Sequence, residues 1–488
     1  MGTIIAVINK KGENATETAV AMLKILKHKN IENFGIASPT TVKTEKSIEA
    51  LQEQNVNSLL VIGHASSKIL TTEKLQPMKL ENATLAFEGR IYRATTGISA
   101  AEAFAKKIRE NREKITEILN RETEGDFTFA IAEHGKIIAG RNVMGVYPLY
   151  FGENVNFVAL ASERKVLWRI GIKNVNSFPP GSIAFVDENG FKLKPVKTLA
   201  YSGAKQITMQ AAAEKLQTLL QRSVKQRVSG LKEAAVAFSG GLDSSIIACL
   251  AKNSGADVHL IHVSLENHQE VEYAKKAAEE LELPIHVYLY NEDDVEKVLQ
   301  KVLWLIEESD PIKTSIGIPL YWTAERAAAM NFKVMLAGQG ADELFGGYRR
   351  YINDYLKYGS EKLHKILFND ILKMHETNFE RDFKICNFHN VELRLPFATY
   401  KIAKFATELP VELKIKKASD GLRKLVVRQV AENLLLPQYI VNKPKKAIQY
   451  TTGVNETLKK ISSKAGLSMK EYLQKTFQII LKKMVNYE

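Results

Sequence analysis

The sequence has little cysteine, no long apolar run and no composition typical of disorder. Two cysteines, Cys249 and Cys386, occur in 488 residues, too few for a disulfide framework or a four-thiolate zinc site. Both lie in apolar surroundings, so we expect buried side chains in a reducing compartment. No apolar run approaches the ~20 residues of a membrane span. The apolar start Met1–Val7 is too short for a secretory signal. We therefore expect a cytoplasmic protein without membrane contact.

Acidic residues are fewer than basic ones, 55 against 68, which gives a net charge of +13. This excess favours anionic partners. The lysines are nevertheless spread along the chain without a helix-turn-helix, zinc-finger or RNP motif, so a nucleic-acid partner is not expected. Attraction of ATP and an acidic substrate explains the charge equally well. The hydrophobic fraction of 45% is ordinary for a globular protein, and the length suits two or three domains.

The most informative stretch is residues 235–248, where a short apolar strand breaks at two glycines and continues as a helix. Backbone N–H groups and the positive end of the helix then face one point, which suits a phosphate. Asp243 in the loop can share a Mg²⁺ ion with that phosphate. The Gly-x-x-x-x-Gly-Lys-Ser/Thr pattern of the Walker loop is absent.

The loop Ser239-Gly240-Gly241-Leu242-Asp243-Ser244 resembles the pyrophosphate loop of enzymes that cleave ATP between its α and β phosphates and adenylate a substrate. The resemblance implies that ATP is bound here. The nucleotide-contacting residues would be Phe238, Ser239, Gly240, Gly241, Asp243 and Ser244. The alternative is a glycine-rich turn of any doubly wound domain.

Residues up to about 200 are predicted to form an α+β domain of short alternating strands and two helical segments. The strands are expected at 4–8, 58–62, 127–133, 136–141, 149–152 and 157–162, and the helices at 16–27 and 101–119.

This part, residues 1–200, resembles the Ntn-type glutaminase domain of class II glutamine amidotransferases, in which two antiparallel sheets lie between helices. Four segments occur in the order of that family: 124–132, 140–152, 161–165 and 178–182. Four matches in order are far more specific than any one of them.

The active-site positions of that family are changed in this chain. The family's cysteine nucleophile corresponds to Gly2, its Gly-His-x-Arg clamp reads Gly63-His64-Ala65-Ser66, and its Asn-Gly-Glu reads Glu88-Gly89-Arg90. A carboxylate at the oxyanion position opposes the charge of the transition state. Thr3 could act as an N-terminal nucleophile only after a second cleavage. We therefore expect a degenerate domain that does not hydrolyse glutamine.

Residues 192–207 are predicted to be a linker, and Thr208–Val228 an amphipathic helix capped by its threonine. The region 208–488 then alternates between strands and helices, which predicts an α/β doubly wound parallel sheet. Strands are expected at 234–238, 258–263, 285–290 and 333–337, and helices at 244–251, 270–281, 293–303 and 319–330.

A second glycine-rich segment, Gly338-Gln339-Gly340-Ala341-Asp342, ends the last of these strands. Its glycines let the backbone approach a ligand, and Asp342 would join Asp243 as a second Mg²⁺ ligand. Together with 306–310, 391–397 and 423–428, this segment resembles the PP-loop ATP pyrophosphatase domain of asparagine synthetase. The resemblance implies that Val263 contacts adenine and that Gly338 and Gly340 help to bind the nucleotide.

Two positions of that resemblance bear on catalysis. Gln339 stands where the family has a glutamate, and an amide can orient a substrate but cannot accept a proton. The family's charge-stabilising lysine corresponds to Lys445 in Lys443-Pro444-Lys445, although Lys446 is an alternative and a solvated loop lysine is another.

The sequence thus predicts an ATP- and Mg²⁺-dependent, AMP-forming ligase that joins ammonia to a small carboxylate, with aspartate favoured. Two alternatives stay open: a synthetase for another acid or amine, including ring closure as in β-lactam synthetases, and a catalytically silent ATP-binding scaffold. A homodimer is also open. Residues 455–484 are predicted to form one or two amphipathic helices that pack on the second domain.

Overall fold

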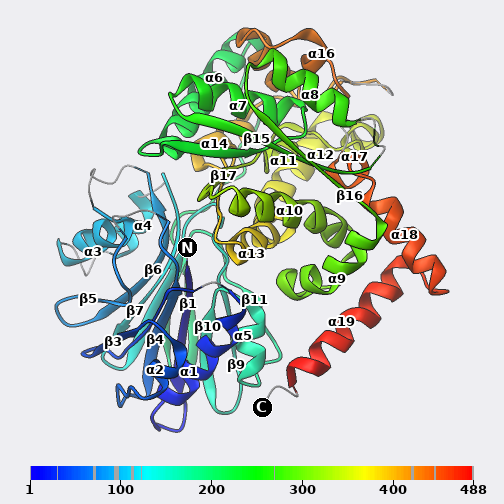
Figure 1. Cartoon of the computed structure of the whole chain (residues 1–488). Coiled ribbons are helices and arrows are strands. Elements are labelled where there is room, and N and C mark those ends of the chain that lie inside the picture. Colours follow the sequence, from blue (N-terminus) through cyan, green and yellow to red (C-terminus); the bar gives the residue numbers. More distant parts are fainter. Residues whose placement is uncertain are drawn as a thin grey trace. The chain divides into compact units, whose positions relative to one another are not determined.

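The computed structural model describes residues 2–29, 31–69, 73–92, 98–110, 115–121, 124–266, 268, 270–418, 422–444 and 447–485. The chain divides into two compact units (Figure 1). The first comprises Met1–Thr198, Asn387–Asn390 and Lys483–Glu488, and the second comprises Leu199–Cys386 and Val391–Lys482.

The first unit contains two antiparallel sheets. Their strand orders are β11-β9-β10-β1-β4-β2-β3 and β13-β12-β8-β7-β6-β5. The strands are β1 (Gly2–Asn9), β2 (Asn33–Ala37), β3 (Val42–Glu45), β4 (Leu60–Ser66), β5 (Met78–Lys79), β6 (Thr84–Ile91), β7 (Gly125–Glu133), β8 (Lys136–Arg141), β9 (Tyr150–Glu153), β10 (Phe157–Ala161), β11 (Asn176–Ser177), β12 (Ser182–Asp187) and β13 (Gly190–Pro195). The helices are α1 (Thr16–Lys24), α2 (Ile48–Gln52), α3 (Ala100–Glu110), α4 (Ile115–Arg121) and α5 (Arg164–Arg169).

Successive side chains of β1 point to opposite faces of its sheet, which explains the layered packing of this unit. Ile4, Ala6 and Ile8 enter a core shared with residues of the second sheet, whereas Ile5 and Val7 face a core that α1 and α5 complete. A third core joins β6 and β7 to α3 and α4. Helices therefore cover the outer face of each sheet, as the resemblance to the amidotransferase domain implies.

Several expectations for this unit differ from the structure in their bounds. The predicted helix 101–119 is two helices, α3 and α4, and the strand expected at 58–62 runs from Leu60 to Ser66. The strands β2, β3, β5, β6, β11, β12 and β13 were not predicted. The linker was expected to begin at Lys192, but β13 extends to Pro195 because it pairs with β12 along its whole length.

The second unit is built on a five-stranded parallel sheet with the order β16-β15-β14-β17-β18. The strands are β14 (Glu233–Ala237), β15 (Asp257–Leu265), β16 (Ile285–Tyr290), β17 (Val334–Leu336) and β18 (Glu392–Arg394). The chain moves from β14 to one side of the sheet and later returns to the other side through β17. This change of direction makes the carboxyl ends of β14 and β17 the switch point of the sheet, the place where ligands of such sheets bind.

Helices surround this sheet (Figure 1). They are α6 (Met209–Val228), α7 (Leu242–Asn253), α8 (Glu270–Glu280), α9 (Glu292–Ile306), α10 (Pro311–Ala329), α11 (Ala341–Phe345), α12 (Arg350–Met374), α13 (Glu380–Phe388), α14 (Tyr400–Glu408), α15 (Leu425–Asn433), α16 (Gln438–Val441), α17 (Ile448–Thr451), α18 (Val454–Lys464) and α19 (Met469–Val485). Thr208 caps α6 as predicted, accepting a hydrogen bond from the Ala211 N–H.

The helix expected to begin at Pro319 begins instead at Pro311. Asp310 caps it by accepting a hydrogen bond from the Lys313 N–H at 2.8 Å, and a proline suits the first helical position. The later Pro319 is buried inside this helix. The prediction was therefore wrong in taking Pro319, and not Pro311, as the first residue of the helix.

The last two helices bury different amounts of their apolar residues. In α18, Val454, Leu458 and Ile461 are buried, as the packing prediction requires. In α19, Leu473 is the one buried residue among the described side chains, and Ile479 is 47% exposed. Met469, Tyr472, Phe477, Ile480 and Leu481 of α19 are partly buried, so the predicted packing extends to α19 but covers this helix less completely than α18. No described helix is both long and apolar enough to cross a membrane.

Candidate active site

The loop between β14 and α7 has the geometry of a phosphate-binding turn. Gly240 has a φ of +67°, and a Cβ on it would lie 3.0 Å from the Ala274 Cα, so glycine is required both by conformation and by space. Within the loop, the Ser239 hydroxyl accepts the Gly241 N–H at 3.3 Å, and the Ser244 hydroxyl donates to the Gly241 carbonyl at 3.1 Å. No side chain caps the first turn of α7, so its N–H groups are available to an anion.

Two carboxylates from the two glycine-rich segments converge on one cation. Lys424 Nζ lies 2.6 Å from Asp243 Oδ2 and 2.7 Å from Asp342 Oδ1. The lysine side chain is 2% exposed. The described residues contain no cluster of three or more histidine, cysteine or acidic side chains that could bind a metal. A Mg²⁺ ion here would therefore take two protein carboxylates and fill its coordination shell with phosphate oxygens and water, which is its usual preference.

Lys424 is the functional candidate that the sequence analysis did not assign. It lies just before α15 with a φ of +59°, an unusual conformation for a lysine. Its contact with Asp243 spans 181 residues of sequence. In the sequence, Lys424 was notable only as part of segment 423–428, which resembles the family. Nothing in that segment indicates that Lys424 contacts Asp243 or Asp342.

The segment after β17 brings further predicted residues to the same place. A Cβ on Gly338 would lie 2.9 Å from the Asp243 Cβ, so this backbone packs directly against the first loop. Gly340 has a φ of +90° and precedes α11, which carries Asp342 in its first turn. Glu343, the second acid of this segment, is buried and accepts hydrogen bonds from Tyr348 and Asn378. Burial, and after it the charge of the neighbouring Asp342, raises the pKa of Glu343.

The strand β15 offers backbone groups beside the phosphate loop. Its pairing with β14 ends at the register Ala237 to Ile261, and the Phe238 N–H then donates to the Ile261 carbonyl at 2.9 Å. Polar groups two residues further on point to the same side of a strand. The N–H and carbonyl of Val263 therefore face the region beyond the end of β14, as contact with a base edge requires.

Gln339 is hydrogen-bonded to a buried acid. Its Nε2 donates to Asp382 Oδ2 at 2.7 Å, and the other oxygen of Asp382 accepts from Arg381 Nε at 2.7 Å. Burial raises the pKa of Asp382, and the adjacent guanidinium of Arg381 opposes this change. Neither Arg381 nor Asp382 was singled out in the sequence, because Asp382 lies 43 residues from Gln339.

The predicted charge-stabilising lysine, Lys445, and its alternative, Lys446, both lie outside the described residues. The chain leading to them is held by Arg428, whose guanidinium donates to the Val441 carbonyl and, at 3.1 Å, to the Lys443 carbonyl. Lys443 itself pairs with Glu270 at 2.7 Å and lies over the Tyr273 ring. These contacts fix the backbone of residue 443, just before Lys445, beside Glu270 and Tyr273 of α8.

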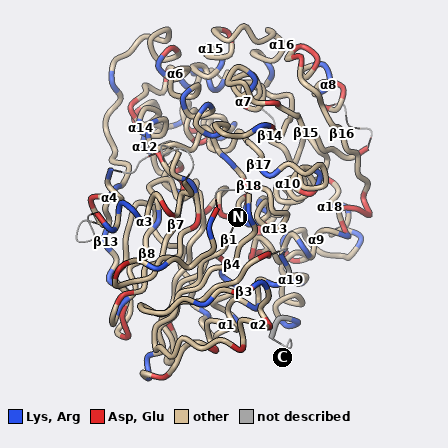
Figure 2. Tube along the Cα trace, turned by 60° about the vertical axis from the view of Figure 1, so that its left-hand side comes forward, with Lys and Arg blue, Asp and Glu red and all other residues tan. Residues whose placement is uncertain are grey.

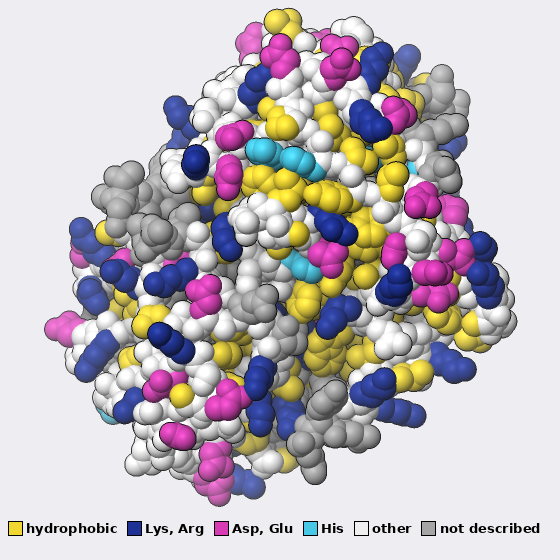
Figure 3. All heavy atoms as spheres, in the orientation of Figure 1, with side chains coloured by type: hydrophobic (Ala, Val, Ile, Leu, Met, Phe, Trp, Pro, Cys, Tyr) yellow, Lys and Arg dark blue, Asp and Glu magenta, His cyan; other side chains and the backbone are white. Residues whose placement is uncertain are grey.

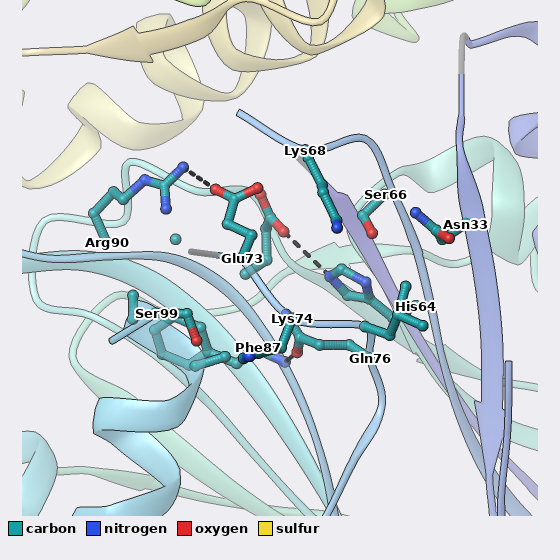
Figure 4. A pocket seen from close by; sticks show the side chains of 15 residues that line it. Asn33, His64, Ser66, Lys68, Glu73, Lys74, Gln76, Phe87, Arg90 and Ser99 are labelled. Atoms are coloured by element: carbon teal, nitrogen blue, oxygen red, sulfur yellow. Dashed lines mark hydrogen bonds and ion pairs between the residues drawn. The ribbon is translucent and has the colours of Figure 1, made fainter. Parts of the chain in front are cut away.

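The first unit contains a polar pocket lined by His64, Glu88 and Arg90, three of the positions that the sequence analysis compared with a glutaminase site (Figure 4). His64 Nε2 lies 3.2 Å from Glu88 Oε2, and Arg90 pairs with Glu73. Burial works against ionisation of Glu88, but hydrogen bonds from His64 and the Gly2 N–H hold its pKa below the ordinary value. Asn33, Ser66 and Lys68 also line the pocket.

The side chains of this pocket occupy the space that a residue 2 side chain would need. A Cβ built on Gly2 would lie 2.5 Å from Glu88 Oε2 and 2.6 Å from His64 Nε2, closer than real contacts allow. The Thr3 hydroxyl is buried and accepts a hydrogen bond from Lys29 at 3.2 Å. Lys29 is in turn ion-paired with Glu163. The Thr3 hydroxyl is therefore part of a buried network of polar side chains.

Comparison with known proteins identifies both parts of the chain. The sequence profile of the family described as asparagine synthase matches residues 215–359 and 354–479. The profile described as glutamine amidotransferase domain matches residues 64–169.

Two sequence relatives and one solved structure illustrate the likeness. A Methanocaldococcus jannaschii protein with the provisional name asparagine synthetase 1 (glutamine-hydrolysing) is 30% identical, covering 96% of this chain and 97% of that protein. The glutamine-hydrolysing asparagine synthetase B of Escherichia coli is 26% identical, covering 72% of this chain and 66% of that protein. Bacillus subtilis glutamine phosphoribosylpyrophosphate amidotransferase covers 58% of this chain and 65% of its own, with 15% identity and a TM-score of 0.35.

Proposed function

Because this chain belongs to the asparagine synthase family, we propose that it is an ATP-dependent amide ligase that adenylates a small carboxylate and transfers ammonia to it. Aspartate is the favoured carboxylate, and the products are then asparagine, AMP and pyrophosphate. The observation that carries the proposal is the convergence of Asp243 and Asp342 on one cation beside a glycine-rich phosphate loop.

Each part of the site has a separate task in this proposal. The loop N–H groups at the start of α7, with Ser239 and Ser244, bind the β and γ phosphates, and the backbone of Phe238 and Val263 binds the base. Asp243 and Asp342 would hold Mg²⁺, which neutralises charge on the pyrophosphate when it is bound. Gly338 and Gly340 allow the second segment to approach the nucleotide closely.

The reaction is an acyl transfer in two steps. A carboxylate oxygen attacks the α phosphorus, and pyrophosphate leaves with the β and γ phosphates. The nitrogen of ammonia then attacks the acyl carbon, AMP leaves and the nitrogen loses a proton. Lys424, which is buried and pairs with both aspartates, is proposed to stabilise the negative charge of the pyrophosphate as it leaves. Lys445 is proposed to stabilise charge at the reacting carbonyl.

The nitrogen source is proposed to be free ammonia. The two relatives named above are called glutamine-hydrolysing, but in this chain Gly2 has no side chain and its Cβ space is filled by His64 and Glu88. The carboxylate of Glu88 also stands where an oxyanion donor is needed, and its lowered pKa keeps it charged. The first unit then acts as a structural partner.

A second candidate is an adenylating synthetase for another acid or amine, including ring closure on the substrate's own amine. Two observations favour it: the neutral Gln339 in place of the family's glutamate, and Gly2 in place of the cysteine. A silent ATP-binding scaffold is less well supported, since the phosphate loop, both aspartates and Lys424 form one intact cluster.

The test is to incubate the protein with ATP, MgCl₂ and ammonium chloride over a panel of small acids, and to quantify AMP and pyrophosphate. Aspartate-dependent formation of both supports the first candidate. Formation with another acid, but not with aspartate, supports the second. ATP-induced thermal stabilisation without any AMP would instead indicate the scaffold.

A further inference from the structure

Lys424 and a magnesium ion would take the same two carboxylates of the proposed active site. The Nζ of Lys424 lies 2.6 Å from Asp243 Oδ2 and 2.7 Å from Asp342 Oδ1. A Mg²⁺ ion bound to these two oxygens at its usual distance of about 2.1 Å would lie within about 5 Å of the ammonium group. Two cations at that distance in a largely buried site repel each other strongly.

The fold of the second unit builds the contact of this lysine with the aspartates. Lys424 is buried, and its backbone has a φ of +59°, a conformation that is uncommon for a lysine. A Cβ built on Gly347 would lie 2.4 Å from Lys424 Cε and 1.8 Å from Asp342 Oδ1. The lysine side chain therefore reaches Asp342 through space that any side chain at position 347 would fill.

Two arginines near this lysine in the chain add to the positive charge around the aspartates. Arg423 Nη1 donates to the Gly347 carbonyl at 2.6 Å, and Arg428 Nε donates to the Arg423 carbonyl at 2.7 Å. The charge of Arg423 interacts with Asp342, and that of Arg428 interacts with Asp243. A divalent cation that arrives alone thus meets two carboxylates that are already balanced by three positive side chains.

A polyphosphate would change this balance. Asp243 lies in the first turn of α7, whose N–H groups are not capped by any side chain in the described parts of the chain. An anion bound to those N–H groups lies beside Asp243, and hence beside the ammonium of Lys424. Its oxygens can complete the coordination shell of Mg²⁺, and they offer the ammonium a new charged partner.

We propose that Lys424 releases Asp243 and Asp342 to Mg²⁺ only when a polyphosphate is bound as well. The ammonium group then moves from the carboxylates to the phosphate oxygens. This inference rests on the proposed function, because it describes how the same site is loaded. It makes Lys424 the residue through which metal binding depends on the nucleotide.

Binding of Mn²⁺, a paramagnetic substitute for Mg²⁺, tests the exchange without any turnover. The bound ion is measured by electron paramagnetic resonance, with and without pyrophosphate, for the parent, Lys424→Met and Lys460→Met. Lys460 is an exposed lysine that pairs with Glu292, so its variant is the matched control. Pyrophosphate also chelates Mn²⁺ in solution, but this contribution is the same for every protein and cancels in the comparison.

The expected results concern the affinity for Mn²⁺ in each condition. Without pyrophosphate, Lys424→Met should bind Mn²⁺ at least tenfold more tightly than the parent, and Lys460→Met should match the parent. Pyrophosphate should then tighten Mn²⁺ binding by the parent at least tenfold more than by Lys424→Met, because the variant has no lysine to displace. Adding Asp342→Asn to Lys424→Met should abolish the gain, which assigns the bound ion to this site. If Lys424→Met does not fold, Lys424→Gln, which keeps a hydrogen-bond donor, replaces it with the same expected direction.

Two results would overturn the inference. Equal tightening by pyrophosphate in the parent and in Lys424→Met would show that the lysine is a fixed counter-ion that stays in place. Binding of Mn²⁺ alone by the parent as tightly as by Lys424→Met would show that the lysine does not compete. The proposed function fails on a different observation, the lack of AMP formation by the parent with every acid, and the Mn²⁺ measurements do not depend on that outcome.

Discussion

Lys424 pairs with both Asp243 and Asp342, and its removal is the most direct test of that cluster at the scale of one residue. Without it, two carboxylates face each other in a largely buried site, and breaking such a pair costs about 3–5 kcal/mol. We expect Lys424→Met to lower the Tm, and MgCl₂ with pyrophosphate to restore part of the loss by replacing the cation. Lys460→Met, which removes an exposed partner of Glu292, is the control. Equal Tm values for Lys424→Met and the parent would refute the role of the lysine.

Gly2 makes a second prediction for a single residue. Gly2→Cys supplies the family's nucleophile, but its Cβ collides with His64 and Glu88, and such overpacking costs about 1–3 kcal/mol. The variant should have a lower Tm and still release no glutamate from glutamine. Gly203→Cys, at a position with open space around it, should keep the parent Tm. Glutamate release by Gly2→Cys would show that the oxyanion position still functions.

Lys414 makes stability depend on pH in a defined direction. It is completely buried, its Nζ donates to the Ala406 carbonyl at 2.5 Å, and burial lowers its pKa to about 7. Between pH 7 and about 10.4 the unfolded state binds the extra proton, so stability rises with pH by at most about 1.4 kcal/mol per unit. Urea unfolding at pH 7.5 and 9.5 should show this rise relative to Lys414→Met, but not relative to Lys416→Met, an exposed lysine. Parallel profiles for all three proteins would contradict the burial effect.

At the scale of the elements, the turn between β14 and α7 is set by backbone conformation. Gly240→Ala forces alanine into a left-handed conformation, at about 1–2 kcal/mol, and pushes its Cβ against Ala274. We expect the ATP-induced rise in Tm to be lost. Gly255→Ala is matched in backbone conformation, with a φ of +84°, but has open space around it, so it should keep the ATP response. An equal ATP-induced rise in Tm in both variants would show that the loop does not bind the nucleotide.

The elements also show which features the sequence could predict. The loop of Gly240 and Asp243 was predictable because glycine, acid and helix start lie within a few residues of one another. Lys424 and Asp382 were not, because their partners lie 181 and 43 residues away and are brought together by the order of the strands. Helix bounds failed where two signals competed, as at Pro311 and Pro319, and strands β2 and β3 were missed because their apolar alternation is weak.

At the scale of the whole molecule, the excess of 13 positive charges is distributed and not gathered into one basic element. Lys and Arg alternate with Asp and Glu along the helices and strands of both units (Figure 2). The face shown in Figure 3 likewise mixes basic and acidic side chains between apolar ones. A net charge of this sign raises the general attraction for small anions such as ATP.

The central claim is that the second unit cleaves ATP at its α phosphate to activate a carboxylate, while the first unit no longer supplies nitrogen from glutamine. Product analysis of one reaction series tests it: ATP, MgCl₂ and aspartate with either ammonium chloride or glutamine. The account predicts equal amounts of AMP and pyrophosphate with ammonium, and no glutamate with glutamine. ADP with orthophosphate, or steady release of glutamate, would contradict it.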